Sequence, residues 1–366
     1  LGAVLAILLG ALPAVAEKHS PGIWLSLVNN DGRTIRAEVI EIGDESVRIR
    51  RKSGETFEIK LENLAAATAL DLETLRGSER WKFRPFPDGW HRRVTREGRR
   101  KSIAERGGTP ECEKAVEEAL WWLGINQKKD GSWDESNQVA MTGLALLAYL
   151  GHGETPLSEE FGQTVVDAMV YLIDVAIKQK GRLATDPKDK HWCYEHGIAT
   201  QALAEAFMVC DRLIINIPNL EEAVQGAGQW IVDHQHKSGG WDYGYDMDSA
   251  RGGDLSVTTW QVTALGAVLR TRVELRNARE CLVKAGRYVK KCQAENGGFG
   301  YTTAKRTIDA AGVHTLTGAG IRCLQVCSPR DAGEISAAAG YITKSAVLDP
   351  EESRFPLYAH YHYCHA

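Results

Sequence analysis

The segment QKKDGSW at residues 127–133 recurs twice, as QHKSGGW at 235–241 and as QAENGGF at 293–299. Each copy reads glutamine, two variable residues, a polar residue, glycine, a small residue and an aromatic residue. Glycine permits the left-handed turn that often follows a helix, and a glutamine amide can satisfy backbone groups left unpaired at a helix end. We therefore expect a structural rather than a catalytic role for the motif residues Gln127, Trp133, Gln235, Trp241, Gln293 and Phe299.

The motif is part of a longer repeat. Gln179 begins a degenerate fourth copy, so the glutamines follow one another at intervals of 52, 56 and 58 residues, enough for one helical hairpin per interval. Apolar residues recur every three or four positions after Cys112, in nine segments and in the start of a tenth near Phe355. This periodicity predicts that residues 111–366 are all-α.

The repeated glutamine–tryptophan motifs make residues 111–366 resemble the squalene/terpene cyclase and prenyltransferase repeat family. This resemblance implies an (α/α) toroid, in which inner and outer helices alternate around a central cavity. The chain supplies fewer helices than a closed ring of this family contains, and the run 358–366 reads as the beginning of a further inner helix. We therefore expect an incomplete toroid, truncated at the C-terminus.

Residues 17–75 follow a different pattern. Short runs with apolar residues at alternate positions, between 23 and 64, are separated by turn signals such as NDG and KSG, and they predict a small antiparallel sheet or barrel. The runs RTIRAEV (33–39), VRIRRKSGET (47–56) and IKLENL (59–64) resemble the SHD-type first homology domain of endocytic actin-patch adaptors. That resemblance implies an SH3-like all-β barrel with a protein or peptide partner.

Residues 76–110 are strongly basic. Between 76 and 108 there are eleven Arg or Lys against four Asp or Glu, interleaved with aromatic residues and prolines. Such a composition occurs in surfaces that bind nucleic acid, but a solvated linker whose aromatic residues dock on a neighbouring domain is the simpler explanation. We predict a basic linker and no nucleic-acid partner.

The first sixteen residues predict export. An apolar run from Val4 to Leu12 is followed by Pro13 and the small triplet AVA, which is the pattern of a signal peptide cleaved after Ala16. The run is shorter than the roughly 20 residues that a membrane-spanning helix needs, and no later segment is long enough. We predict a signal peptide over residues 1–16, no other membrane span, and a periplasmic or secreted protein.

Composition excludes several other classes. The 366 residues are 43% hydrophobic and 25% charged with a net charge of −4, which rules out a disordered or collagen-like chain. The eight cysteines contain no Cys-x-x-Cys pair, so neither a zinc ribbon nor a thioredoxin-like motif is present. The high counts are 36 glycines and 10 tryptophans, the two residue types that meet in the repeat motif.

A cyclase of the toroid family must protonate an alkene or epoxide, which requires a carboxylic acid kept neutral in an apolar cavity. The family uses an Asp-x-Asp-Asp motif for this step, and this chain has no two adjacent aspartates. The nearest candidates are Asp246, Asp248 and Asp254. Asp254 is better explained as the N-cap of the helix that begins near Val257.

Zinc prenyltransferases of the same fold bind their metal through Asp, Cys and His. Asp254 and His314 match two of these positions, whereas Ser256 stands where the thiolate is needed. Without the sulfur ligand the remaining pair is a poor zinc site, so we expect no metal and no other cofactor. His314 joins the three aspartates as a catalytic candidate.

Two functions remain open. The first is a non-catalytic binding module, in which the toroid holds a hydrophobic small molecule, a peptide or a protein. The alternative is a terpene cyclase or isoprenoid transferase with diverged acids, where Trp192, Tyr194, Trp260 and Tyr361 would line the cavity and stabilise carbocations. The absence of adjacent carboxylates favours the first. The two differ in whether the four catalytic candidates converge on one apolar cavity.

Overall fold

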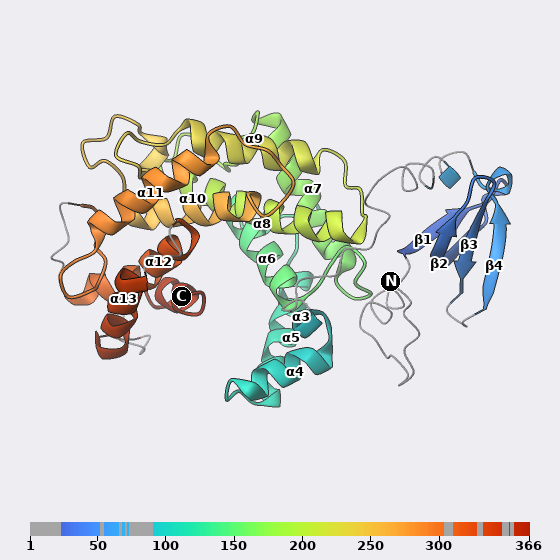
Figure 1. The fold of residues 1–366 in the computed structure, drawn as a ribbon, viewed down its shortest axis with the longest axis horizontal. Helices are drawn as coiled ribbons and strands as arrows, with labels where there is room; N and C mark the ends of the chain where they lie inside the picture. The colour runs from blue at the N-terminus through green and yellow to red at the C-terminus, as the bar shows by residue number, and fades with distance from the viewer. Residues whose placement is uncertain are drawn as a thin grey trace. The chain divides into compact units, whose positions relative to one another are not determined.

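The computed structural model describes residues 23–51, 55–65, 68, 69, 72, 91–303, 310–327, 332–345, 351 and 355–366. Within them a small β-sheet is followed by a long run of helices, which confirms the predicted order of a β region and an α-rich region (Figure 1). The predicted signal peptide over residues 1–16 lies outside the described residues.

The chain divides into two compact units, which are described separately. The first comprises Leu1–Ile125, Ala148–Val166 and Met208–Ile217, and the second comprises the remainder of the chain. Three helices contribute residues to both units. The predicted boundaries at residues 75 and 110 therefore stay predictions.

The first unit contains one antiparallel sheet, with its strands in the order β1-β2-β3-β4. Apolar side chains at alternate positions, such as Val39, Val47 and Ile49, are buried and form the core of this sheet. The strands are β1 (Ile23–Val28), β2 (Thr34–Ile42), β3 (Ser46–Arg50) and β4 (Thr56–Lys60).

After β4 the chain returns to β1. A short 3-10 helix, η1 (Leu61–Asn63), precedes an antiparallel bridge between Leu64 and Asn29. The Ala65 amide then donates to the Val28 carbonyl at 2.8 Å. Because β1 is an edge strand, this return covers part of an edge that would otherwise be open.

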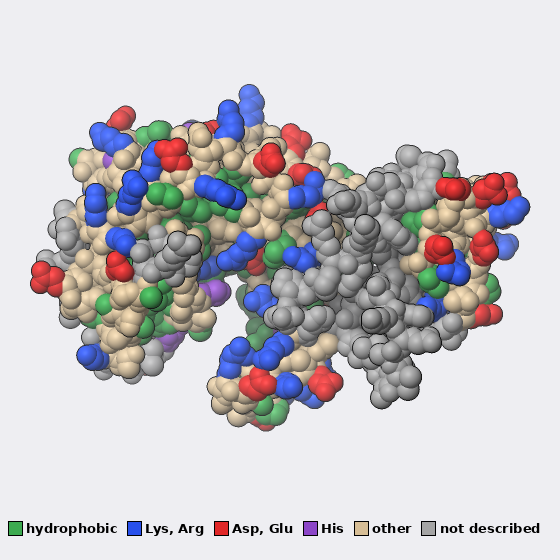
Figure 2. Space-filling view, in the orientation of Figure 1, with side chains coloured by type: hydrophobic (Ala, Val, Ile, Leu, Met, Phe, Trp, Pro, Cys, Tyr) green, Lys and Arg blue, Asp and Glu red, His purple; other side chains and the backbone are tan. Residues whose placement is uncertain are grey.

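Part of the predicted basic linker is helical, as α3 (His91–Val94) and α4 (Arg96–Glu105). Arg99 Nε donates to the Glu113 carboxylate at 2.6 Å and so joins α4 to α5 (Pro110–Ile125). Other basic side chains of α4 face the solvent, with acidic ones between them (Figure 2). Residues 76–90 of the predicted linker lie outside the described residues.

Ten helices, α5 to α14, lie in the described part of the chain at the positions of the ten helical segments predicted after Cys112. None of the described helices is long and apolar enough to cross a membrane. After α5 they are α6 (Gln138–His152), α7 (Gly162–Lys178), α8 (Trp192–Leu213), α9 (Leu220–Asp233), α10 (Leu255–Val268), α11 (Ala278–Cys292), α12 (Ala310–Cys327), α13 (Ala332–Ser345) and α14 (Pro356–Tyr363).

The helices from α9 onward form two layers in the second unit (Figure 1). All 14 residues of α10 are buried, whereas α9 and α11 each bury one face only. Helix α10 packs against α9, α11 and α12, and α12 packs against α13 and α14. We call α10, α12 and α14 the inner layer and α9, α11 and α13 the outer layer.

Glycines let several pairs of helices approach closely, among them α8 and α10 and the inner-layer helices α12 and α14. A Cβ atom on Gly197 of α8 would stand 2.7 Å from the Trp260 Cβ in α10. One on Gly318 of α12 would stand 3.1 Å from the His362 backbone in α14, so a larger residue would push these helices apart. The same close approach occurs at Gly143, from α6 to α8, and at Gly266, from α10 to α12.

The motif glutamines tie consecutive outer helices together. Gln235 Nε2 donates to the Gly239 carbonyl at 2.8 Å within its motif and to the Cys281 carbonyl of α11 at 2.9 Å. Gln293 makes the two equivalent bonds, at 3.1 Å within its motif and at 2.9 Å to the Glu334 carbonyl of α13. Each glutamine thus satisfies a carbonyl near the start of the next outer helix.

A threonine completes each joint, a contact that the sequence did not reveal. The Thr258 hydroxyl accepts from the Trp241 amide at 3.0 Å, and the Thr317 hydroxyl accepts from the Phe299 amide at 3.1 Å. The Trp133 amide bonds to a threonine of α6 in the same way, at 3.2 Å. All three motif aromatic residues are buried, so their rings shield these bonds from water.

Candidate functional site

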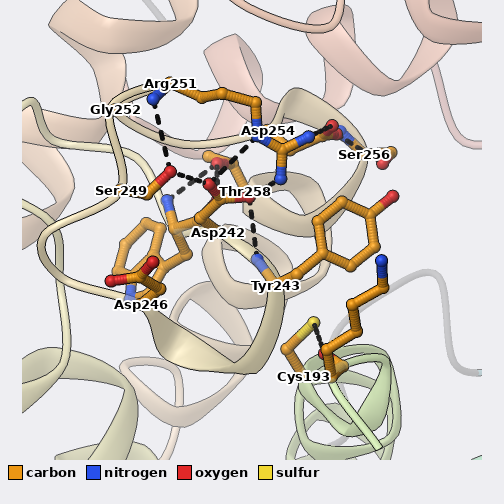
Figure 3. Close-up of polar contacts among 12 residues, drawn as sticks. Cys193, Asp242, Tyr243, Asp246, Ser249, Arg251, Gly252, Asp254, Ser256 and Thr258 are labelled. Carbon is orange, nitrogen blue, oxygen red and sulfur yellow. Dashed lines mark hydrogen bonds and ion pairs between the residues drawn. The ribbon is translucent and has the colours of Figure 1, made fainter.

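The second repeat motif brings two buried aspartates to the N-terminal end of α10. Trp241 is fully buried, and its indole N–H donates to the Ile231 carbonyl at 2.9 Å. The Asp254 amide donates to the Trp241 carbonyl at 2.8 Å, so the loop over residues 242–253 begins and ends at the same point. Asp242 and Asp254 are therefore neighbours at the head of α10 (Figure 3).

Asp242 is surrounded by donors. Its carboxylate accepts from the Tyr243 amide at 2.8 Å and from Arg251 Nε at 3.2 Å, and also from the Ser249 hydroxyl and Arg251 Nη2. The Asp242 side chain is 3% exposed, whereas that of Arg251 is 48% exposed. A buried carboxylate with a cation and several donors around it has both its charge and its lone pairs satisfied.

Asp254 caps α10, as predicted. Its Oδ1 accepts from the Ser256 amide at 2.9 Å and from the Ser256 hydroxyl at 2.6 Å. Burial raises the pKa of Asp254 above its usual value, and the bonds from Ser256 and the Arg251 charge, 3.7 Å away, oppose this rise. Asp254 is thus a buried acid with a raised pKa at a helix N-terminus.

A series of neighbouring hydroxyl groups leads from Asp254 to Tyr194 of α8. The Tyr194 hydroxyl lies 2.8 Å from Ser256 Oγ and 3.0 Å from the Tyr243 hydroxyl. Burial raises the pKa of Tyr194 far above its usual value, so this phenol stays protonated at neutral pH. Asp254, Ser256, Tyr194 and Tyr243 therefore form a chain of side chains within hydrogen-bonding distance.

The other predicted acids lie away from this chain. Asp246 and Asp248 are exposed in the loop after η3 (Tyr243–Tyr245), where Asp246 Oδ1 accepts from the Asp248 amide at 3.0 Å in a local turn. In the described part of the molecule neither joins the cluster at the head of α10. His314 belongs to α12, but its side chain lies outside the described residues.

Three of the four predicted cavity-lining aromatic residues lie together. Trp260 and Tyr361 stack with ring centroids 5.3 Å apart, and Tyr194 packs against the same apolar cluster. Trp192 belongs to a different cluster, where its ring centroid lies 4.8 Å from that of Tyr245. The structure thus brings together part of the predicted aromatic wall, from α8, α10 and α14.

Among the described residues, no group of three or more His, Cys, Asp or Glu side chains is arranged so that it could hold a metal ion. Ser256, at the position where a zinc enzyme of this fold needs sulfur, is bonded to Asp254 instead. The eight cysteines form no disulfide with one another. Burial raises the pKa of Cys193 and of Cys323 to about 12, so neither is a thiolate near neutral pH.

The sheet of the first unit has a pocket of its own, with a volume of about 510 Å³, beside the β1–β2 turn. Apolar side chains line it, among them Leu27, Ile35 and Ile59, together with polar ones such as Asn29 and Arg33. This mixture suits a short peptide segment, which presents both apolar side chains and backbone polar groups.

Sequence reasoning missed Asp242 and Arg251. Asp242 directly follows Trp241, the last residue of the repeat motif. This position could have indicated that Asp242 is buried, because the residue next to a buried motif aromatic is also drawn into the interior. Arg251 offered no such signal, because its contact with Asp242 spans nine positions of an irregular loop.

No protein-family model matches the sequence. A search of curated proteins also finds no similar sequence.

Proposed function

We propose that the chain is an exported, non-catalytic binding protein whose helical part is an (α/α) toroid of the squalene cyclase and prenyltransferase repeat type. The toroid holds a hydrophobic small molecule in its interior. The small sheet, as an SH3-like barrel of the SHD type, binds a protein or peptide. Export to the periplasm or the medium is supported by the apolar run ahead of Ala16.

The repeated joints support the toroid. Gln235 and Gln293 tie consecutive outer helices together, and close contacts at Gly197 and Gly318 join α8 to α10 and α12 to α14. When a structural unit repeats with the same small rotation at each step, the array curves. A double layer of helices built in this way bends towards a ring, with its inner helices around the centre.

The return of the chain to β1 supports the barrel. Leu64 and Ala65 pair with the outer edge of β1, which is the step by which a four-stranded meander begins to close on itself. The pocket beside the β1–β2 turn is the surface that we assign to the peptide, because the partly exposed side chains of Ile35 and Ile59 supply apolar contacts there.

One observation favours binding over catalysis: the two buried carboxylates at the head of α10 are already engaged. Asp242 is paired with Arg251, and Asp254 accepts two bonds from Ser256 as the N-cap of α10. An acid that protonates an alkene has to present its proton to an apolar cavity, whereas these oxygens face hydrogen-bond donors. The aromatic cluster around Trp260 then serves binding.

A terpene cyclase or isoprenoid transferase is the second candidate, and the surroundings of Asp254 favour it. The raised pKa brings this acid nearer to the neutral form that catalysis requires. Ser256 connects it to the hydroxyl of Tyr194, which packs with Trp260 and Tyr361. In this alternative the Tyr194 hydroxyl contacts the substrate and donates the proton to it, and Asp254 replaces that proton through Ser256.

The deciding experiment incubates the full chain with squalene and with prenyl diphosphates and analyses the products. Binding of squalene is followed in parallel by tryptophan fluorescence. We expect saturable binding of squalene and no product. Asp254→Asn keeps an oxygen for the helix cap and removes the acidic proton, and Asp246→Asn, at an exposed position, is the matched control.

Product formed by the unchanged chain and by Asp246→Asn, but not by Asp254→Asn, would establish the enzyme and reject the binding module. A chain that forms no product would reject the enzyme, and a chain that also fails to bind squalene would reject squalene as the ligand.

A further inference from the structure

We propose that Arg322 holds the carboxylate of an apolar ligand inside the helical unit. This inference rests on the proposed hydrophobic ligand and adds the chemistry of its head group. Arg322 lies on α12 and is 8% exposed, yet no carboxylate of the described residues forms an ion pair with it. A guanidinium buried without a carboxylate is uncommon, because removing a lone charge from water costs much free energy.

The guanidinium of Arg322 is only partly satisfied. Nη2 donates to Gln201 Oε1 of α8 at 3.3 Å, and the Gln201 amide donates in turn to Glu205 at 2.9 Å. Nη1, which carries two N–H groups, is buried and has no hydrogen-bond partner among the described residues. The guanidinium carbon lies 5.4 Å from the centre of the Tyr361 ring. The face of the ring attracts the cation, but it is not a conventional hydrogen-bond acceptor for the N–H groups.

Two further buried polar side chains beside Arg322 are unsatisfied within the described residues. His362 of α14 is fully buried with both ring nitrogens unpaired, and the hydroxyl of Tyr358, one turn earlier, is buried and unpaired as well. Their ring centroids are 4.4 Å apart, and the Arg322 charge acts on both groups. Neighbouring donors that face no acceptor indicate a place for an ion or ligand.

The charge of this cluster matches a single negative charge. Burial lowers the pKa of His362 to about 3, with Arg322 and His365 acting in the same direction, so the imidazole is neutral near pH 7. Burial raises the pKa of Tyr358 well above 10, so the phenol is neutral too. Arg322 then supplies one positive charge, which a carboxylate balances while its two oxygens fit the edge of a guanidinium.

The side chains around the cluster are apolar, so the rest of the ligand should be apolar as well. Trp260 of α10 stacks on Tyr361, and its ring centroid lies 5.4 Å from that of His362. Ile198 packs against Trp260 in the same apolar cluster. Each methylene buried here contributes about 0.8 kcal/mol, so a long-chain carboxylic acid fits both parts of the site. Because the unpaired atoms are buried, binding requires the helices that carry them, α12 and α14, to shift.

The test compares three probes of equal chain length on the full chain: dodecanoate, dodecyl phosphate and methyl dodecanoate. Binding is measured by tryptophan fluorescence and by the shift in Tm. We expect dodecanoate to bind about tenfold or more tightly than the ester, since a hydrogen bond to a charged group contributes about 1.5–3 kcal/mol. We expect dodecyl phosphate to bind more weakly than dodecanoate, because Arg322 balances one negative charge and a phosphate monoester carries more than one.

Two variants locate the carboxylate. Arg322→Gln should abolish the preference for dodecanoate over the ester. Arg272→Gln, which changes a half-exposed arginine paired with Glu221, should keep that preference. A preference that survives in Arg322→Gln would overturn the proposal. The comparison of probes on the unchanged chain does not depend on the folding of any variant.

Failure of this site can be told apart from failure of the proposed function. Equal binding of dodecanoate and its ester would overturn the carboxylate site and leave the hydrophobic ligand standing. Tighter binding of dodecyl phosphate would overturn the assignment of a single negative charge. If squalene and all three probes fail to bind, both the site and the proposed function are wrong.

Discussion

A Cβ atom on Gly297 would stand 2.5 Å from the carbonyl oxygen of Ala337 in α13. Gly297 also has a φ angle of +91°, which residues with a side chain rarely adopt. The joint between α11 and α12 therefore requires glycine for two independent reasons. The glycines of the other joints approach α7, α9 and α11 in the same manner, at Gly131, Gly181 and Gly239 respectively.

We expect Gly297→Ala to lower the free energy of unfolding by about 2 kcal/mol or more, because both the backbone strain and the overlap with α13 must be relieved. Urea denaturation measures this change. Gly340→Ala is the control, since an added Cβ there meets no atom within 4 Å inside α13, and it should stabilise the protein by up to about 1 kcal/mol. Similar effects of the two changes would refute the steric role of the joint.

The threonine of the joint can be tested with Thr258→Val. The Trp241 amide would lose its acceptor in a buried position, so we expect the free energy of unfolding to fall by about 1–3 kcal/mol. Thr343→Val, at an exposed position of α13, should change it by less than about 0.5 kcal/mol. A Thr258→Val protein as stable as the original would show that water replaces the hydroxyl.

The pair of Asp242 and Arg251 should stabilise the loop before α10. Arg251→Gln leaves the Asp242 carboxylate buried without its cation, and we expect a loss of about 1–3 kcal/mol, since Arg251 itself is half exposed. Arg276→Gln removes an exposed pair with Asp233 and should cost less than about 1 kcal/mol. Equal losses in thermal or urea denaturation would contradict a special role for Asp242.

Stability should fall as the pH is lowered below about 6.5, and His196 is one cause. Its Nδ1 accepts from the Leu183 amide at 2.9 Å and its Nε2 lies 3.2 Å from the Ala227 carbonyl, so the neutral imidazole is the form that fits. Burial lowers the pKa of His196 to about 3. Between about pH 6.5 and 3 this histidine is protonated in the unfolded chain but not in the folded chain. The free energy of unfolding therefore falls by about 1.4 kcal/mol for each pH unit of acidification within this range.

His196→Gln tests this dependence. The variant should be less stable than the original near pH 7, because it loses the ring hydrogen bonds. Its stability should nevertheless fall less steeply with acid, by about 1.4 kcal/mol per pH unit, when urea denaturation is compared at about pH 7, 6 and 5. An unchanged slope would mean that other groups carry the acid sensitivity.

The helices and the repeat were predictable because both depend on residues close together in the sequence. Gln235, Gly239 and Trp241 form their joint within seven consecutive residues, and helix positions follow from apolar residues every three or four positions. The capping of α10 by Asp254 was predictable for the same reason, since its donors belong to Ser256, two residues later.

The candidate site was only partly predictable. Asp246 and Asp248 were chosen because they match part of a family motif, and both are exposed, whereas the unchosen Asp242 and Arg251 form a buried pair. Spacing alone cannot distinguish these aspartates, because the difference lies in which of them the loop turns inward.

By itself, the sequence determined the order of a β region and an α-rich region, the positions of the helices and the joints between them, since local patterns encode all three. Only the tertiary structure decided which charged groups are buried and what surrounds them. Arg322 meets Gln201 across 121 positions and lies beside His362 and Tyr361 of the last helix. The free energy of a buried charge depends on its neighbours in space, and those neighbours come from segments far apart in the chain.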